Sequence, residues 1–207
     1  MNLKFLSAGL IAATLMFGAK AEANDFEILA GDKGVTIDTK ITAEVAPRTN
    51  VYLRGITYAD YSDNIGYFGL ADLTVNIIEG LDAVAEIQFV PEFGAIFRAG
   101  VQYYKEIGDF SFYGLGTAGL SKNPDGEFLV ELKYLPEIAE NVKLLFSAEN
   151  VTNFNVDGHN LSSQKLRTGL KLDKYSFGVA ADLSELKDVS GEILVDSNIG
   201  GFGKVDF

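Results

Sequence analysis

The end of the chain constrains its fold more than any other stretch. From Ile193 to Phe207 every second position carries a side chain that suits an apolar surface, and the positions between are mostly polar. The first set is Ile193, Val195, Ser197, Ile199, Gly201, Gly203, Val205 and Phe207. Because successive side chains of a strand point to opposite sides, this period of two predicts a β-strand with two different faces.

The same alternation recurs along most of the chain. The predicted strands are Phe26–Ala30, Val35–Ala46, Val51–Ala59, Tyr67–Ile78, Ala83–Val90, Ala95–Lys105, Phe110–Leu120, Glu127–Leu135, Val142–Val151, Gln164–Leu172, Tyr175–Ser184 and Ile193–Phe207. All four prolines fall between these segments, where a missing backbone donor does no harm. Most segments have about nine to eleven residues, which is the length that a tilted strand needs to cross a bilayer.

Most of the predicted strands have one face without charges. In Val35–Ala46, for example, Asp38 and Lys40 oppose Ile37 and Thr39. Arg or Lys facing lipid near the bilayer midplane costs about 2–4 kcal/mol, so a membrane strand must keep its charges on the other face. A soluble β-sandwich also alternates, and the alternation by itself leaves that alternative open.

The N-terminus has the features of a secretory signal peptide. A short basic start is followed by an apolar run from Phe5 to Gly18, and small residues at Ala19, Ala21 and Ala23 suit cleavage. The run is too short for a spanning helix. We therefore expect a signal peptide at 1–23 and one domain at 24–207.

The alternating final strand with its terminal aromatic residue resembles the C-terminal assembly signal of bacterial outer-membrane β-barrel proteins. The resemblance rests on Phe207 and Val205 and covers one strand. It implies outer-membrane lipid and the barrel-assembly machinery as partners, and the outer membrane of a Gram-negative bacterium as the location. It also implies that Phe207 marks the periplasmic end of the last strand.

Counting back from Phe207 sorts the turns by length. The turns on its side are Pro47–Asn50, Glu79–Asp82, Glu106–Asp109, Pro136–Asn141 and Asp173–Lys174, and all are short. The other side includes the longest predicted loop, Thr152–Ser163. This asymmetry is typical of outer-membrane barrels and is not expected of a sandwich.

Aromatic residues of the uncharged face gather at two levels, as they do at membrane interfaces. Those near the Phe207 side are Tyr103, Phe110, Tyr134, Tyr175 and Phe207, and those near the other side are Tyr67, Phe89, Phe97 and Phe128. The sequence therefore predicts an all-β fold, an up-and-down antiparallel transmembrane β-barrel of about 12 strands. Because Phe26–Ala30 is short for a spanning strand, ten strands is the alternative.

The charged face is predicted to line the barrel interior. The candidate pore-lining residues are Arg54, Asp72, Glu86, Arg98, Glu131, Lys133, Lys143, Lys165, Arg167 and Lys171. Four of these, Lys143, Lys165, Arg167 and Lys171, form a basic stripe on two adjacent strands, whereas Arg54, Asp72, Glu86 and Arg98 occupy four consecutive strands and could pair. Such a lining predicts a porin-like passive channel for small hydrophilic solutes or ions. A filled structural or adhesin-like barrel is the alternative, since twelve strands lie between filled and open sizes.

Composition narrows the remaining alternatives. The formal net charge of −12 favours a mild cation preference and argues against a nucleic-acid partner. The single histidine, His159, precedes Ser162 and Ser163, but their place in a long loop argues against a hydrolase. A partial calcium-loop pattern has Gln164 where a bidentate Glu is needed, so neither a metal nor a cofactor is expected. A soluble periplasmic barrel that binds an apolar ligand would require the apolar face to point inward.

Overall fold

The structure, a computed structural model, describes residues 20–91, 94–122, 124–156, 158–187 and 192–207. Most of the predicted signal peptide lies outside the described residues, and its last part, residues 20–23, continues the first strand. The described residues contain no helix that is long and apolar enough to cross a membrane.

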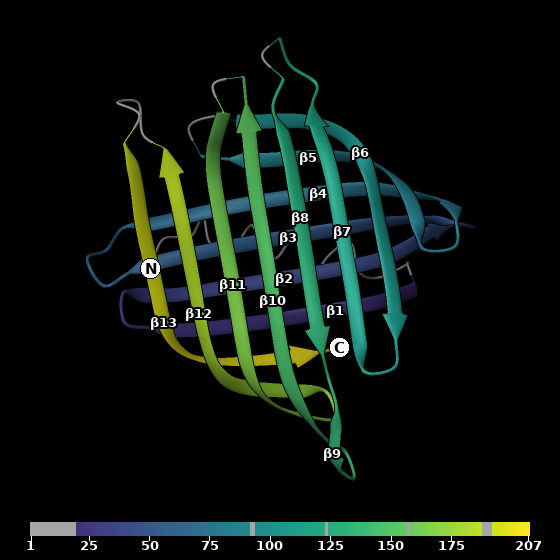
Figure 1. The fold of residues 1–207 in the computed structure, drawn as a ribbon, viewed down its shortest axis with the longest axis vertical. Coiled ribbons are helices and arrows are strands. Elements are labelled where there is room, and N and C mark those ends of the chain that lie inside the picture. Colours follow the sequence, from purple (N-terminus) through teal and green to yellow (C-terminus); the bar gives the residue numbers. More distant parts are fainter. Residues whose placement is uncertain (1–19, 92–93, 123, 157, 188–191) are drawn as a thin grey trace.

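Strands account for almost all of the described chain. They are β1 (Lys20–Gly31), β2 (Gly34–Ala46), β3 (Thr49–Asp60), β4 (Ile65–Ile78), β5 (Leu81–Val90), β6 (Gly94–Ile107), β7 (Phe110–Gly119), β8 (Gly126–Tyr134), β9 (Glu137–Ala139), β10 (Val142–Asn155), β11 (Gly158–Leu172), β12 (Tyr175–Lys187) and β13 (Ile193–Asp206). Apart from β9, each strand pairs antiparallel with the next long strand, and β13 pairs with β1. The result is a closed up-and-down barrel of 12 long strands, in which the strands of the near wall cross those of the far wall obliquely (Figure 1).

The predicted fold and strand count are confirmed, while three local predictions are wrong. The first strand is longer than the predicted Phe26–Ala30 segment and pairs with both β2 and β13, so the ten-strand alternative is excluded. The turn Pro136–Asn141 contains the short β9, which pairs with β10. The predicted loop Thr152–Ser163 is mostly strand, because β10 and β11 stay paired up to Asn155 and Gly158.

The turns at the end of the barrel that carries Phe207, the Phe207 end, are tight for a local reason. Each contains one residue with a positive φ angle, which reverses the chain in few residues. These residues are Arg48, Gly80, Gly108, Asn141 and Asp173. The longer connection 61–64, between β3 and β4, lies at the other end of the barrel, here called the opposite end.

The two faces of the barrel wall differ as the alternation predicts. Apolar side chains on the outer face are exposed, for example Val179 at 61%, Ile199 at 56% and Leu166 at 46%. Charged side chains on the inner face are buried, including Asp38, Arg54 and Arg98. The inverted arrangement required for a soluble barrel with an apolar interior is therefore not observed.

Candidate functional site

A buried charged network, the Arg54 network, spans the barrel interior. Arg54 on β3 donates from Nε and Nη2 to the two carboxylate oxygens of Asp38 on β2, at 3.1 and 2.7 Å. The same Nη2 donates to Glu149 Oε1 on β10 at 2.9 Å. Because β3 and β10 belong to opposite parts of the closed sheet, this guanidinium connects two walls across the lumen.

Two lysines complete the Arg54 network. Lys165 Nζ on β11 lies 2.7 Å from Asp38 Oδ2, and Lys40 Nζ on β2 lies 3.7 Å from Glu149 Oε2. The side chains of Arg54, Asp38 and Glu149 are only 5%, 6% and 9% exposed. Charges buried to this degree are tolerated when they are paired and hydrogen-bonded, as these are.

Neighbouring ion pairs extend the charged layer. Arg167 on β11 lies 2.7 Å from Glu27 on β1 and 2.6 Å from Asp182 on β12. Lys133 lies 2.7 Å from Glu131 on the same strand. Lys204 on β13 lies 2.8 Å from Asp25 on β1, across the pairing that closes the barrel.

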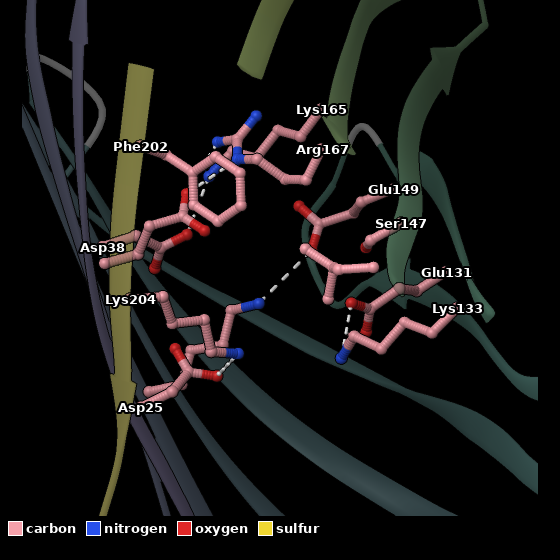
Figure 2. A pocket seen from close by; sticks show the side chains of 13 residues that line it. Asp25, Asp38, Glu131, Lys133, Ser147, Glu149, Lys165, Arg167, Phe202 and Lys204 are labelled. Atoms are coloured by element: carbon pink, nitrogen blue, oxygen red, sulfur yellow. Dashed lines mark hydrogen bonds and ion pairs between the residues drawn. The ribbon is translucent and has the colours of Figure 1, made fainter. Parts of the chain in front are cut away.

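These charges surround a small cavity of about 40 Å³ inside the barrel. Figure 2 shows carboxylates and ammonium groups directed toward one another from different walls, with Asp38 and Lys204 on one side and Glu149 and Glu131 on the other. A single water needs about 10–15 Å³ by the same kind of measure, so the cavity has room for a few waters. The lumen at this level is polar and narrow.

An apolar cluster narrows the interior further. Leu29, Leu145, Ala180 and Phe202 are buried together, each at most 8% exposed. The Arg167 guanidinium carbon lies 5.9 Å from the Phe202 ring centroid, a favourable cation–π distance. The face pattern of the last strand did not reveal this role of Phe202, because the residue sits among polar neighbours on the inner face.

A second group of charges, the acidic cluster, lies on β4 to β8. It consists of Asp72, Glu86, Asp125 and Glu127 around Arg98. Arg98 is only 2% exposed, and it lies 2.6 Å from Asp125 and 3.3 Å from Glu86. Gln88 Nε2 donates to both Glu86 Oε1 and Glu127 Oε1 at 2.9 Å. The Arg98 guanidinium thus contacts two of the four carboxyl groups, those of Asp125 and Glu86.

Asp125 belongs to the connection between β7 and β8, outside the strands. Burial opposes its ionisation, but hydrogen bonds from Arg98 and Asn153 together with the Arg98 charge outweigh burial and hold its pKa below the usual range. Its carboxylate is therefore a fixed negative charge at the opposite end of the barrel at neutral pH.

The structure distributes the candidate pore-lining residues unevenly. Arg54, Lys165, Arg167, Glu131 and Lys133 lie in or beside the central network. Arg98 pairs with Glu86 as expected, but Arg54 pairs with Asp38 and Glu149 rather than with Asp72.

The residues of the predicted basic stripe lie on two adjacent strands as expected, but most of their positive charges are paired with carboxylates. Lys165, Arg167 and Lys171 each pair with a carboxylate, the last with Asp206. Lys143 faces Lys171 across β10 and β11, close to the Phe207 end. Sequence reasoning missed Glu27, Asp25, Asp125 and Glu127, because it treated their segments as a short strand or a loop edge.

His159 and Ser162 lie on the outer face of the barrel wall. The loop in which they were expected is the paired end of the hairpin formed by β10 and β11. His159 Nε2 and Ser162 Oγ are 2.8 Å apart. Ser162 pairs with Thr152, which in turn pairs with the exposed Phe128, so these side chains share the outer face. The His–Ser pair is therefore not part of the lumen.

The proposed assembly signal closes the barrel. Val205 pairs with Phe26 on β1 and with Tyr175 on β12. The backbone N–H of Phe207 donates to the carbonyl of Asn24 at 3.0 Å, while the residue as a whole is 55% exposed. The last residue thus contributes to the pairing that joins the two ends of the chain.

A solved structure shares the barrel architecture of this chain. It is similar to a solved structure of the NanC porin, with a TM-score of 0.54 and 8% sequence identity over 88% of this chain and 98% of that one. The chain shares the closed antiparallel β-barrel fold of that porin. A loop L8 deletion mutant of OmpT, an outer-membrane protein of Vibrio cholerae, matches over 90% of this chain and 97% of that one at 9% identity, with a TM-score of 0.34.

No protein-family model and no curated protein sequence matches the chain. Within the described ranges, no group of three or more His, Cys, Asp or Glu side chains is arranged to hold a metal ion. The Arg54 network and the acidic cluster present charges and hydrogen-bonding groups to the lumen.

Proposed function

We propose that this outer-membrane barrel is a narrow, porin-like passive channel for ions and small hydrophilic solutes, with a mild preference for cations. One observation carries the proposal: a closed 12-strand barrel places its charged side chains around a polar lumenal cavity. Rings of charged side chains are a common way for a pore to admit and select small polar solutes. The likeness in fold to the NanC porin is compatible with this function.

The cation preference rests on the distribution of charge. The acidic cluster contributes four carboxyl groups and one guanidinium to the wall formed by β4 to β8. The chain as a whole has a formal charge of −12. A negative potential at the opposite end of the lumen concentrates cations there and repels anions.

The orientation forms part of the proposal. The tight turns at the Phe207 end would face the periplasm, and the longer connections would face outward, as in other outer-membrane barrels. This placement requires export by the predicted signal peptide at 1–23 and insertion by the barrel-assembly machinery.

A filled structural barrel is the second candidate, and a specific observation favours it. The side chains of the Arg54 network are almost inaccessible to solvent, and the central cavity of about 40 Å³ has room for a few waters at most. In that case the ion pairs would serve to hold the walls together rather than to select solutes.

Conductance in planar bilayers distinguishes the two. A channel should give discrete current steps, and in a KCl gradient its reversal potential should shift toward the value for cations. The variant Glu127→Gln removes one carboxylate from the acidic cluster and should weaken that shift. The variant Lys33→Gln changes a charge at the opposite end that is 49% exposed and paired with Asp196, and serves as a surface control. Absence of current at all voltages would favour the filled barrel, and anion preference would contradict the proposed selectivity.

A further inference from the structure

Two acidic side chains face each other directly inside the acidic cluster. Asp72 on β4 and Glu86 on β5 are register partners in an antiparallel pair. Both point inward, and they are 3% and 4% exposed. Directly opposed residues have Cβ atoms about 4.5–5.5 Å apart, and like charges in this arrangement destabilise a sheet.

Each of these carboxyl groups has one oxygen without a hydrogen-bond partner. The atoms are Asp72 Oδ1 and Glu86 Oε2, and both are buried. The nearest cation is engaged elsewhere: Arg98 donates from Nε to Thr117 Oγ1 at 2.8 Å and from Nη1 to Asp125 Oδ2 at 2.6 Å. Its contact with Glu86, at 3.3 Å, involves the other oxygen, Oε1. Gln88 also donates to Oε1.

The surrounding elements add more acid than base. Glu127 faces the pair from β8, and Asp125 approaches Arg98 from the connection before it. Tyr113 on β7 faces both acids, but its hydroxyl donates to Gln102. Tyr52 on β3 is the register partner of Asp72 on the other side. Among these described neighbours Arg98 supplies the positive charge, which leaves the pair short of a cation or a donor.

The space around the two unpaired oxygens decides which cation can supply the missing positive charge. The two oxygens have essentially no accessible surface, so neither a water nor a hydrated ion reaches them. The described residues also lack a metal-binding group of three. A proton needs no additional space, and it converts one of the two acceptors into a donor for the other.

We propose that Asp72 and Glu86 form a proton-binding carboxyl pair that holds one proton between its two groups at neutral pH. One carboxyl carries the O–H and donates to the facing carboxylate, so the pair bears a single negative charge. Two carboxylates that share a buried site behave in this way because they cannot both ionise without strong repulsion. The pair binds its proton whether or not the barrel conducts, so this inference is independent of the proposed channel.

The proton links folding to pH. In the unfolded chain both groups have pKa values near 4 and are ionised at neutral pH. The folded barrel therefore binds one proton more than the unfolded chain, and its stability falls as pH rises. The folding equilibrium constant should drop by up to about tenfold per pH unit until the pair releases its proton.

The test is urea unfolding of the barrel in lipid vesicles between about pH 5 and 8, the range over which this linkage acts. The wild type should lose stability with a slope that approaches one proton. Asp72→Asn replaces the shared proton by an amide that can donate to Glu86, so the slope should disappear. Glu79→Gln, whose side chain is 93% exposed in the following turn, should keep the wild-type slope.

Two outcomes would overturn the proposal: a flat wild-type profile, or a slope that survives Asp72→Asn, in particular one that is lost in Glu127→Gln instead. If Asp72→Asn does not fold, infrared difference spectra of the wild type between neutral and alkaline pH replace it. The loss of a protonated carboxylic acid C=O band supports the pair, and the absence of any such band contradicts it. A lack of conductance would overturn the channel and leave these results unaffected.

Discussion

Removal of the Arg54 side-chain charge should destabilise the barrel more than any exposed charge change. Arg54→Met keeps a long apolar side chain but leaves Asp38 and Glu149 without the guanidinium that joins them. Removing one partner of a buried ion pair typically costs about 3–5 kcal/mol. Lys165 remains 2.7 Å from Asp38 and Lys40 remains 3.7 Å from Glu149, so we expect the lower limit, about 3 kcal/mol.

The assay is equilibrium urea unfolding in vesicles, with Lys33→Met as the matched control. The Lys33–Asp196 pair is 49% and 60% exposed, so its loss should change the unfolding free energy little. The double variant Arg54→Met with Glu149→Gln should lose less stability than the sum of the single variants, because the second change removes a charge that the first left unpaired. A loss below about 1 kcal/mol for Arg54→Met, or strict additivity, would refute the reasoning that this network is buried and coupled.

Local contacts support three further predictions. Deletion of Phe207 removes its hydrogen bond to Asn24 and the proposed assembly signal, so time-resolved folding into vesicles with the assembly machinery should be slower, while the folded conductance should change little. A Cβ at Gly100 would meet the backbone oxygen of Gly116 at 1.9 Å, whereas at Gly55 it would meet nothing within 4 Å. Gly100→Ala should therefore lower the unfolding free energy by about 1–3 kcal/mol, which is measured as a lower urea midpoint, whereas Gly55→Ala should leave the midpoint unchanged. Equal effects of the two substitutions would contradict the close strand approach at Gly100. Because the pKa of Asp125 is held low in the folded state, its contribution to stability is present above about pH 4 and is lost as pH falls below it. Asp125→Asn should flatten the acid limb of the stability profile, and an unchanged limb would count against the Arg98–Asp125 pair.

The fold was predictable because the strands of this barrel repeat one simple constraint. Charges such as Asp38, Arg54 and Glu149 had to share one face of their strands, and that parity located the lumen. The same constraint says nothing about where two strands stop pairing. The Asn- and Ser-rich stretch from Thr152 to Ser163 has the composition of a loop, yet its backbone continues the ladder on the outer wall.

The ion-pair partner of a charged residue was less predictable than the face of the strand on which the residue lies. Arg54 and Asp72 lie on adjacent strands, but the guanidinium reaches Glu149 on a strand that is distant in sequence, because closure of the sheet brings β3 and β10 to opposite sides of one narrow lumen. Phe202 could not be assigned an interior role from alternation alone, because the space it fills depends on the neighbouring wall. Predicting such contacts requires the barrel's diameter and register as well as its alternation.

The central claim is that the apolar face of these strands contacts lipid while the charged face is enclosed. The chain contains no tryptophan, so a single introduced indole reports on its own surroundings. We predict that Val179→Trp, at an outer-face position that is 61% exposed, is strongly quenched by lipids brominated along their acyl chains. Tyr61→Trp, in the connection between β3 and β4, should be quenched weakly by the same lipids. Equal quenching at both positions, or none at Val179→Trp, would contradict the membrane-spanning barrel.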